Sequence, residues 1–190
     1  MEIILASASP RRKMLLEQLD LDFIVQPSQI DEAKVELEIP SELVQRLSYL
    51  KANDVWSKQS QIVIAADTVV SNQNQILGKP ANKKEAKEML INLSGSTHQV
   101  MTGITVISSE AVITDYEKTN VTFKQVTEEE IDDYIATGEP LDKAGAYGIQ
   151  GKGAVFVKKI EGCFYNVVGL SLYRLVKIMS KAGLEIELNG

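Results

Sequence analysis

Short apolar runs alternate with amphipathic segments along most of the 190-residue chain. Short runs rich in β-branched residues are typical of strands, whereas apolar residues that recur every three or four positions are typical of helices. Strands are predicted over residues 3–6, 23–25, 61–70, 99–108, 111–124 and 154–160, with a hairpin return over 76–80. Helices are predicted over residues 11–19, 41–55, 84–93, 127–138 and 171–181. The alternation predicts an α/β or α+β protein, but it does not order the strands of the sheet.

Three helix starts carry recognisable signals. Thr127 and Glu130 have the spacing of a capping box. Ser41 is the predicted N-cap of the second helix, with Pro40 ending the segment before it. Ser9 is the predicted N-cap of the first helix and is followed by a proline, which tolerates the first helical position because its missing amide hydrogen has no partner there.

The first helix also begins with three cations, at positions 11–13. Positive charges in a first turn oppose the helix dipole, at a cost of about 0.3 to 1 kcal/mol each. A phosphate group would reverse that balance, because it would meet free amide hydrogens, the dipole and the guanidinium groups together. The segment therefore predicts a polyphosphate site. The alternative is an ordinary solvated helix start whose long side chains bend away.

A carboxylate interrupts the most apolar run of the chain, where Asp67 and Thr68 stand within residues 61–70. Runs of this kind are usually strands covered on both faces, and a buried carboxylate must be hydrogen-bonded, paired or bound to a cation. If the strand ends near residue 70, Asp67 lies close to its carboxyl end, where α/β proteins place reactive residues. Asp67 is therefore the first candidate for chemistry. The alternative is a structural aspartate that caps a neighbouring turn.

Lys51 lies on the apolar side of the second predicted helix, four residues after Leu47 and four before Val55. A cation buried there needs an anionic partner. A lysine that snorkels from the edge of the apolar stripe explains the position equally well.

The segment 144–153 contains four glycines, which excludes regular structure throughout. The backbone must turn tightly here or approach another group closely. A flexible linker is the alternative, although Tyr147 and Ile149 between the glycines favour an ordered loop.

Composition narrows the class of protein. Hydrophobic residues make up 44% of the chain, which suits one globular domain over residues 1–190, or two small lobes, with a sizeable core. The formal net charge of −6 argues against broad nucleic-acid or membrane-surface binding. No apolar run approaches the roughly 18 residues of a membrane span, and the N-terminus lacks signal-peptide features. A single cysteine excludes an intrachain disulfide, and a single histidine excludes a multi-histidine metal site within the chain. We expect a cytoplasmic protein that binds neither nucleic acid nor membranes.

Seven motifs follow one another in a characteristic order. They are Ser-x-Ser-Pro-Arg-Arg at 7–12, Ile-Asp-Glu at 30–32, Lys-Ala at 51–52, Ala-Asp-Thr-Val-Val at 66–70, Gly-Lys-Pro at 78–80, Ala-Gly-Ala-Tyr-Gly-Ile-Gln-Gly at 144–151 and Asn-Val-Val-Gly-Leu at 166–170. In these motifs, and over nearly its whole length, the chain resembles the Maf family. The resemblance implies a nucleoside triphosphate pyrophosphatase that cleaves between the α and β phosphates with the help of a divalent cation. It also implies nucleotide-pool house-cleaning, with a possible link to septum formation and arrest of cell division.

The fold implied by the resemblance is an elongated mixed sheet flanked by helices, with two lobes, a central cleft and a relationship to ITP pyrophosphatases. A homodimer is expected on the same ground. The family's site residues correspond to Ser7, Arg12, Glu32, Lys51, Asp67, Lys79 and Gln150.

Three further matches indicate the branch that acts on dTTP and UTP, since the 7-methyl-GTP branch typically differs at Arg11, Thr68 and Gln150. An amide such as that of Gln150 can donate to and accept from a uracil or thymine edge, whereas a carboxylate suits guanine.

The residues suggest a mechanism in which Glu32 and Asp67 hold Mg²⁺ or Mn²⁺, and Asp67 also orients or deprotonates the attacking water. Charge on the leaving phosphate would be neutralised by Arg12, Lys51 and Lys79, while Ser7 and nearby amides bind phosphate oxygens. Two alternatives stay open. One is the same chemistry on 7-methyl-GTP or another modified nucleotide, and the other is a non-catalytic nucleotide-binding regulator of cell division.

Overall fold

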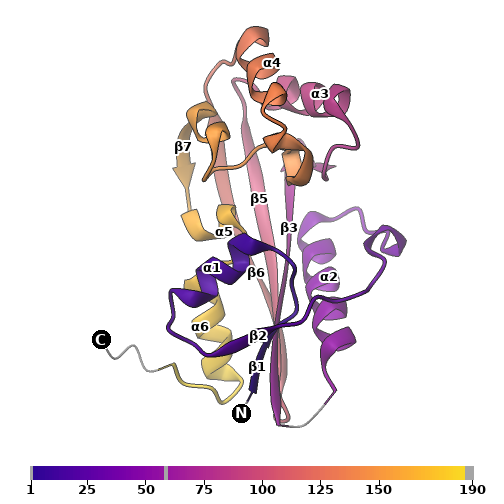
Figure 1. Cartoon of the computed structure of the whole chain (residues 1–190), viewed down its shortest axis with the longest axis vertical. Helices are drawn as coiled ribbons and strands as arrows, with labels where there is room; N and C mark the ends of the chain where they lie inside the picture. Colours follow the sequence, from indigo (N-terminus) through magenta and orange to yellow (C-terminus); the bar gives the residue numbers. More distant parts are fainter. Residues whose placement is uncertain (1, 58–59, 187–190) are drawn as a thin grey trace. The chain divides into compact units, whose positions relative to one another are not determined.

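The computed structural model describes residues 2–57 and 60–186, which form a seven-stranded sheet with helices packed against it (Figure 1). The strands are β1 (Glu2–Leu5), β2 (Phe23–Val25), β3 (Gln61–Asn72), β4 (Gln75–Leu77), β5 (Thr97–Ile107), β6 (Val112–Phe123) and β7 (Val157–Glu161). Their order is β2-β1-β3-β5-β6-β7, and β4 pairs with β3 outside this path.

The α-helices are α1 (Pro10–Glu17), α2 (Pro40–Val55), α3 (Lys83–Leu93), α4 (Glu128–Ala136), α5 (Phe164–Val168) and α6 (Leu172–Lys181). Short 3-10 helices are η1 (Glu32–Lys34), η2 (Glu139–Asp142), η3 (Ala144–Ala146) and η4 (Lys152–Phe156). The predicted mixed α/β class is confirmed. None of the described helices is long and apolar enough to cross a bilayer.

The chain divides into two compact units. The first contains Met1–Asp67, Thr102–Glu117 and Gly169–Gly190, and the second contains Thr68–Met101 and Lys118–Val168. The expectation of one domain over residues 1–190 stays a prediction.

In the first unit, β1 pairs in parallel with β2 and β3, so that Leu5 lies opposite Val25 and Ile64. Alternate residues of these strands face opposite sides. One side packs against α2 in a core made by Ile4, Ala6, Ala52, Val55, Val63, Ala65 and Ile107. Helices α1 and α6 lie on the other side of β1 and β3 (Figure 1). Gly103 allows α2 to approach β5 closely, because a Cβ there would lie 2.2 Å from the carbonyl oxygen of Val44.

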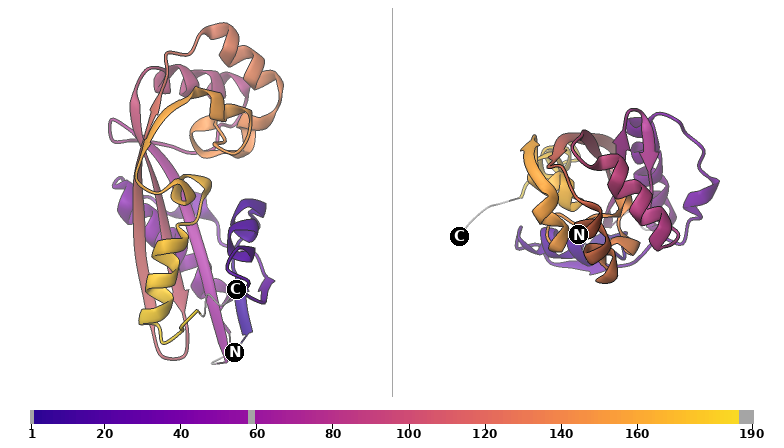
Figure 2. Two further views of the ribbon diagram at one scale, coloured as in Figure 1. Left: turned by 90° about the vertical axis from the view of Figure 1, so that its left-hand side faces the viewer. Right: turned by 90° about the horizontal axis from the view of Figure 1, so that it is seen from above.

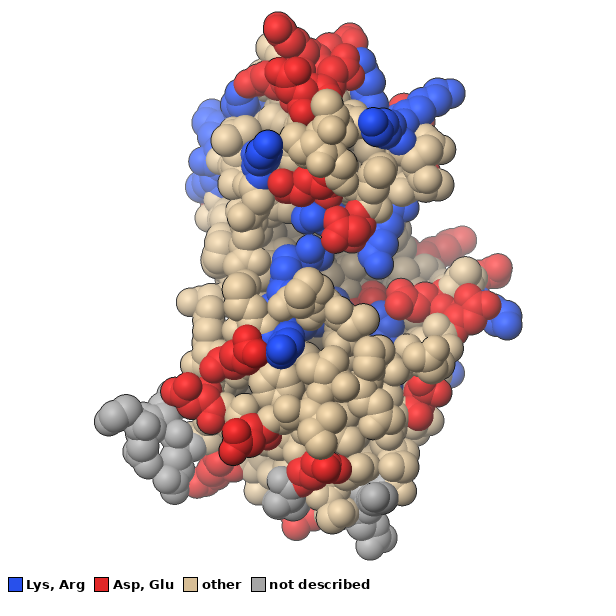
Figure 3. All heavy atoms as spheres, viewed as in Figure 1, with Lys and Arg blue, Asp and Glu red and all other residues tan. Residues whose placement is uncertain are grey.

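In the second unit, α3 and α4 lie side by side over the core (Figure 2). Lys87 of α3 forms ion pairs with Asp132 and Glu128 of α4. The predicted capping box of Thr127 and Glu130 is confirmed. Acidic side chains gather over α4 (Figure 3), in keeping with the three glutamates of its first turn, where negative charge complements the helix dipole.

Several predicted boundaries were wrong. Helix α2 begins at Pro40 with Ile39 as its N-cap, so Ser41 is not the cap and the proline opens the helix rather than ending the segment before it. The strand predicted over 154–160 begins only at Val157, because residues 152–156 form η4 after the extended Gly151. The short helix α5 was not predicted.

His98 is buried in the core of the second unit, where its Nε2 lies 2.9 Å from Tyr147 Oη and its ring packs edge-on against Phe123. Its Nδ1 has no hydrogen-bond partner among the described residues. Burial lowers the pKa of His98 from 6.5 to about 4. The neutral imidazole is therefore part of the folded core.

This burial predicts a loss of stability in acid. As the pH falls from 6.5 to about 4, the unfolded chain protonates His98 but the folded protein does not. The free energy of unfolding should therefore fall by about 3 kcal/mol over that interval because of this group, and by nothing above it. Urea unfolding of wild type and His98→Gln at a series of pH values measures this contribution as the difference between the two proteins. If the free energy of unfolding changed with pH in the same way in both proteins, His98 would not be the group that lowers stability in acid.

Candidate functional site

Three charged groups meet in the first unit. Lys51 Nζ of α2 lies 2.6 Å from Asp67 Oδ1 of β3 and 2.9 Å from Glu32 Oε1 of η1. The side chains of Lys51 and Asp67 are 10% and 9% exposed, and that of Glu32 is 56% exposed. The open question about Lys51 is thus decided, since its ammonium is buried against anionic partners rather than extended to solvent. A buried charge without its partner is costly, so each of these two groups requires the other.

Asp67 does not stand at the carboxyl end of its strand, because β3 continues to Asn72. The first residues of β3, up to Ile64, pair with β1, and its last residues, from Val70, pair with β4. Asp67 therefore lies between these two pairings. The prediction that Asp67 lies near the carboxyl end of its strand was therefore wrong, because the pairing with β4 extends β3 to Asn72.

The loop that carries Glu32 is fastened to α2. Asp54 Oδ2 accepts hydrogen bonds from the Ser28 hydroxyl at 3.0 Å and from the Gln29 amide at 2.8 Å. Asp31 then caps η1 by accepting from the Ala33 amide at 3.3 Å. Sequence reasoning missed Asp54, although its place three residues after Lys51 on the same helix was a usable signal.

The helix start predicted to bind phosphate has the expected cations but not the expected cap. Ser9 occupies the N-cap position, yet its side chain makes no capping bond. Instead, Ser7 Oγ accepts from the Ser9 amide at 3.2 Å and from Arg12 Nη1 at 3.3 Å. Arg11, in the same turn, is half-buried, and the first turn of α1 contains no acidic residue.

Arg12 is held in place by its second contact, from Nε to the carbonyl oxygen of Gly169 at 2.9 Å. Burial lowers the pKa of Arg12, and the negative charges of Asp67 and Glu32 act against this shift. Since arginine stays protonated in proteins, Arg12 is a fixed positive charge within electrostatic reach of both carboxylates.

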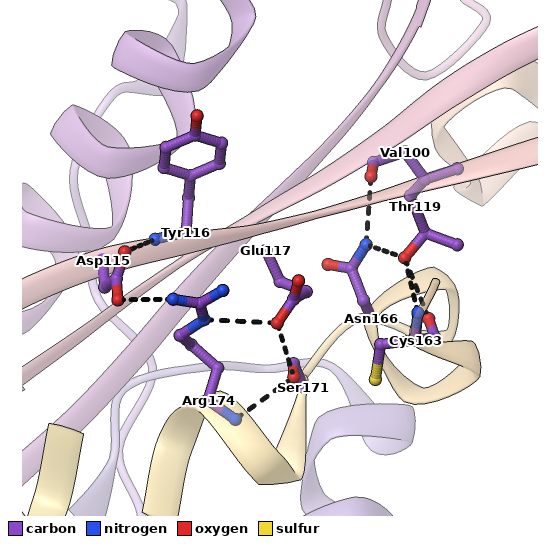
Figure 4. Close-up of polar contacts among 9 residues, drawn as sticks. All are labelled: Val100, Asp115, Tyr116, Glu117, Thr119, Cys163, Asn166, Ser171 and Arg174. Atoms are coloured by element: carbon purple, nitrogen blue, oxygen red, sulfur yellow. Dashed lines mark hydrogen bonds and ion pairs between the residues drawn. The ribbon is translucent and has the colours of Figure 1, made fainter. Parts of the chain in front are cut away.

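Gly169 was not predicted as a contact of Arg12. Its φ of +130° favours glycine, which accounts for a glycine at this position of the motif at 166–170. Two residues later, Ser171 caps α6 by accepting from the Arg174 amide at 3.3 Å. Arg174 binds Asp115 at 2.9 Å and Glu117 at 3.2 Å (Figure 4), which ties the start of α6 to β6.

Asn166 and Thr119 form a separate network within the second unit. Asn166 Nδ2 donates to the carbonyl oxygen of Val100 at 3.0 Å and to Thr119 Oγ1 at 2.9 Å (Figure 4). Thr119 Oγ1 also accepts from the Cys163 amide at 3.1 Å. The asparagine is completely buried, so this part of the motif at 166–170 joins α5 to the sheet.

The remaining candidates belong to the second unit. Thr68 follows Asp67 directly, so the two side chains point to opposite faces of β3. Lys79 is exposed in the loop after β4, and Gln150 is exposed in the glycine-rich segment. The Gly145 amide donates to the carbonyl oxygen of Gly78 at 3.0 Å, which places the loop of Lys79 beside the start of that segment. The segment is ordered rather than a linker.

Two carboxylates are available for a divalent cation. Among residues 2–57 and 60–186, no group of three or more His, Cys, Asp or Glu side chains is arranged to hold a metal ion. Glu32 and Asp67 nevertheless place one oxygen each within 2.9 Å of the same point, the Lys51 ammonium. One or two carboxylates with substrate phosphate oxygens and water are a donor set that Mg²⁺ accepts, so these residues fit such an ion.

The model of the Maf family, described as Maf-like protein, matches residues 2–182. The chain belongs to the Maf family. A dTTP/UTP pyrophosphatase from Bacillus mycoides is 54% identical to this chain over 177 residues, which cover 93% of each chain. A dTTP/UTP pyrophosphatase from Bacillus anthracis is 50% identical over 186 residues, which cover 97% of each chain.

A solved structure shares the fold of this chain at low sequence identity. The HAM1 protein from Coxiella burnetii matches with a TM-score of 0.52 and 14% identity, over 95% of this chain and 99% of that one. Identity at this level shows the fold alone.

Proposed function

We propose that the chain hydrolyses dTTP and UTP between the α and β phosphates, releasing the monophosphate and pyrophosphate. The observation that carries this proposal is the 54% identity, over 93% of both chains, to a protein named dTTP/UTP pyrophosphatase. The cluster of Arg12, Lys51, Asp67 and Glu32 supports it, because it combines two cations for phosphate oxygens with two carboxylates.

In this proposal Asp67 orients the attacking water and accepts its proton. Its Oδ1 is fixed by Lys51 at 2.6 Å, so the carboxylate is held in one orientation. A carboxylate is a weak base at neutral pH, and most of the acceleration therefore comes from positioning and from neutralising negative charge.

Arg12, Lys51 and Lys79 supply that positive charge as the bridging oxygen leaves. Ser7 Oγ, already within hydrogen-bond distance of Arg12 and of the Ser9 amide, binds phosphate oxygens together with the amides at the start of α1. The absence of acidic residues from the first turn of α1, the part of the structure that would bind the phosphates, supports this role.

Glu32 and Asp67 are the proposed holders of Mg²⁺ or Mn²⁺. The bound ion would supply charge neutralisation on the phosphate oxygens. Lys51 would then hold both carboxylates in place, since it contacts each of them.

Gln150 contacts the base, and Arg11 and Thr68 are further substrate-binding residues. The Gln150 amide offers both a donor and an acceptor, which matches the O4 and N3-H groups of uracil and thymine. Its exposed side chain is free of the packing that would prevent such contacts.

The test is the ratio kcat/KM for a panel of dTTP, UTP, CTP, GTP and 7-methyl-GTP with Mg²⁺ or Mn²⁺. We expect dTTP and UTP to lead, and we expect Gln150→Glu to lower kcat/KM for both by about 10- to 100-fold, because a carboxylate cannot donate to O4. Gln125→Glu, a change of the same kind elsewhere in the unit, is the control. A wild-type preference for 7-methyl-GTP would contradict the assigned base.

A further inference from the structure

Gln150 lies in a loop without regular structure, yet hydrogen bonds hold the backbone on both sides of it. Before it, the Gly148 amide donates to Tyr134 Oη at 3.1 Å. After it, the Lys152 amide donates to Glu139 Oε2 at 2.9 Å and the Gly153 amide to Glu139 Oε1 at 3.4 Å. One phenol and one carboxylate thus bind three amides of the segment 148–153.

The two side chains also bind each other, since Tyr134 Oη donates to Glu139 Oε1 at 2.8 Å. Burial raises the pKa of Tyr134, so its hydroxyl stays a donor. Partial burial acts to raise the pKa of Glu139, but hydrogen bonds from the Lys152 amide and the Tyr134 hydroxyl lower it below its usual range. The carboxylate is therefore an ionised acceptor at neutral pH.

The glycines of the loop make room for this carboxylate. A Cβ at Gly151 would lie 2.2 Å from Glu139 Oε1, and a Cβ at Gly153 would lie 2.7 Å from Tyr134 Oη. Neither glycine has a positive φ. Glycine is thus required at these two positions because the side chains of Tyr134 and Glu139 lie too close to the backbone to leave space for a Cβ. The glycines at 148–153 therefore allow the backbone of this segment to pack against Tyr134 and Glu139.

We propose that Tyr134 and Glu139 are positioning residues for base selection, which act by fixing the backbone on either side of Gln150. This inference rests on the proposed function, since it takes Gln150 as the residue that contacts the base. Neither Tyr134 nor Glu139 need touch the substrate. Releasing the loop would let the Gln150 amide adopt orientations that accept cytosine as well as uracil. The preference for UTP over CTP should therefore fall more than kcat does.

The test compares Glu139→Ala, Glu139→Gln and Tyr134→Phe with wild type. We expect the ratio of kcat/KM for UTP to that for CTP to fall by about tenfold or more in Glu139→Ala, mainly through a higher KM for UTP, with kcat changed less. Glu139→Gln, which keeps one acceptor oxygen, should lie between Glu139→Ala and wild type. Glu161→Gln, an exposed glutamate paired with Lys159 in the same unit, is the matched control and should leave the ratio unchanged.

The same ratio is measured without turnover from dissociation constants of the α,β-methylene analogues of UTP and CTP. If wild type turns over no triphosphate, the proposed function fails, but the binding ratio still tests the positioning role. An unchanged UTP to CTP ratio in folded Glu139→Ala and Tyr134→Phe, or an equal loss for both nucleotides, would overturn the inference.

Discussion

Replacement of Asp67 by asparagine is expected to lower kcat for dTTP about 100-fold or more while changing KM far less. The carboxylate is buried and its Oδ1 is fixed 2.6 Å from Lys51 Nζ, so the proposed water contact depends on this one group. Asparagine keeps the size of the side chain but can neither accept a proton nor balance the charge of Lys51. The effect should therefore fall on the transition state rather than on nucleotide binding.

Steady-state kinetics and calorimetric binding of the α,β-methylene analogue of dTTP, at fixed Mg²⁺, separate these two effects. Asp133→Asn is the matched control, because it makes the same change at an exposed position of α4. Thermal unfolding establishes that both variants are folded. Activity within a few-fold of wild type in Asp67→Asn would contradict the role assigned to Asp67.

Replacement of Lys51 by methionine is expected to destabilise the protein by about 3 kcal/mol, because it leaves Asp67 as a buried carboxylate without its cation. The Lys51 side chain is only 10% exposed, so water cannot readily take its place. The same change should also lower kcat, since it removes a positive charge proposed to act on the leaving phosphate.

A double-mutant cycle separates the interaction energy between Lys51 and Asp67 from the effect of each single substitution on stability. Urea unfolding is measured for wild type, Lys51→Met, Asp67→Asn and the double variant. We expect the double variant to be more stable than the sum of the single effects predicts, by about 1 kcal/mol or more, because it buries no uncompensated charge. Strictly additive effects would show that the ion pair does not carry the stability assigned to it.

Local signals in the sequence were sufficient for elements whose boundaries depend on neighbouring residues. The capping box of Thr127 and Glu130 and the strand over residues 23–25 were predicted correctly, since each is set within a few positions. The start of α2 was misplaced because Pro40 is compatible both with a helix start and with the end of the preceding segment. Only the packing of the folded chain decides between these two roles.

The charges of the site were predictable, but the groups that position them were not. Lys51 and Asp67 attract notice because charges interrupt apolar patterns, and the structure joins them across 16 positions of sequence. The carbonyl of Gly169 lies 157 positions from Arg12, and a backbone carbonyl has no sequence signature. Glu139 likewise resembles any surface glutamate until its contacts with the amides of Lys152 and Gly153 are seen.

The proposed function depends above all on cleavage of dTTP between the α and β phosphates. Phosphorus NMR of dTTP incubated with the full chain and Mg²⁺ tests it most directly, with the Asp67→Asn variant measured in parallel. We expect resonances of dTMP and pyrophosphate in equal amounts with wild type, and a rate at least about 100-fold lower with the variant. Formation of dTDP and inorganic phosphate would contradict the site of cleavage, and unchanged dTTP despite tight binding would instead identify a nucleotide-binding regulator.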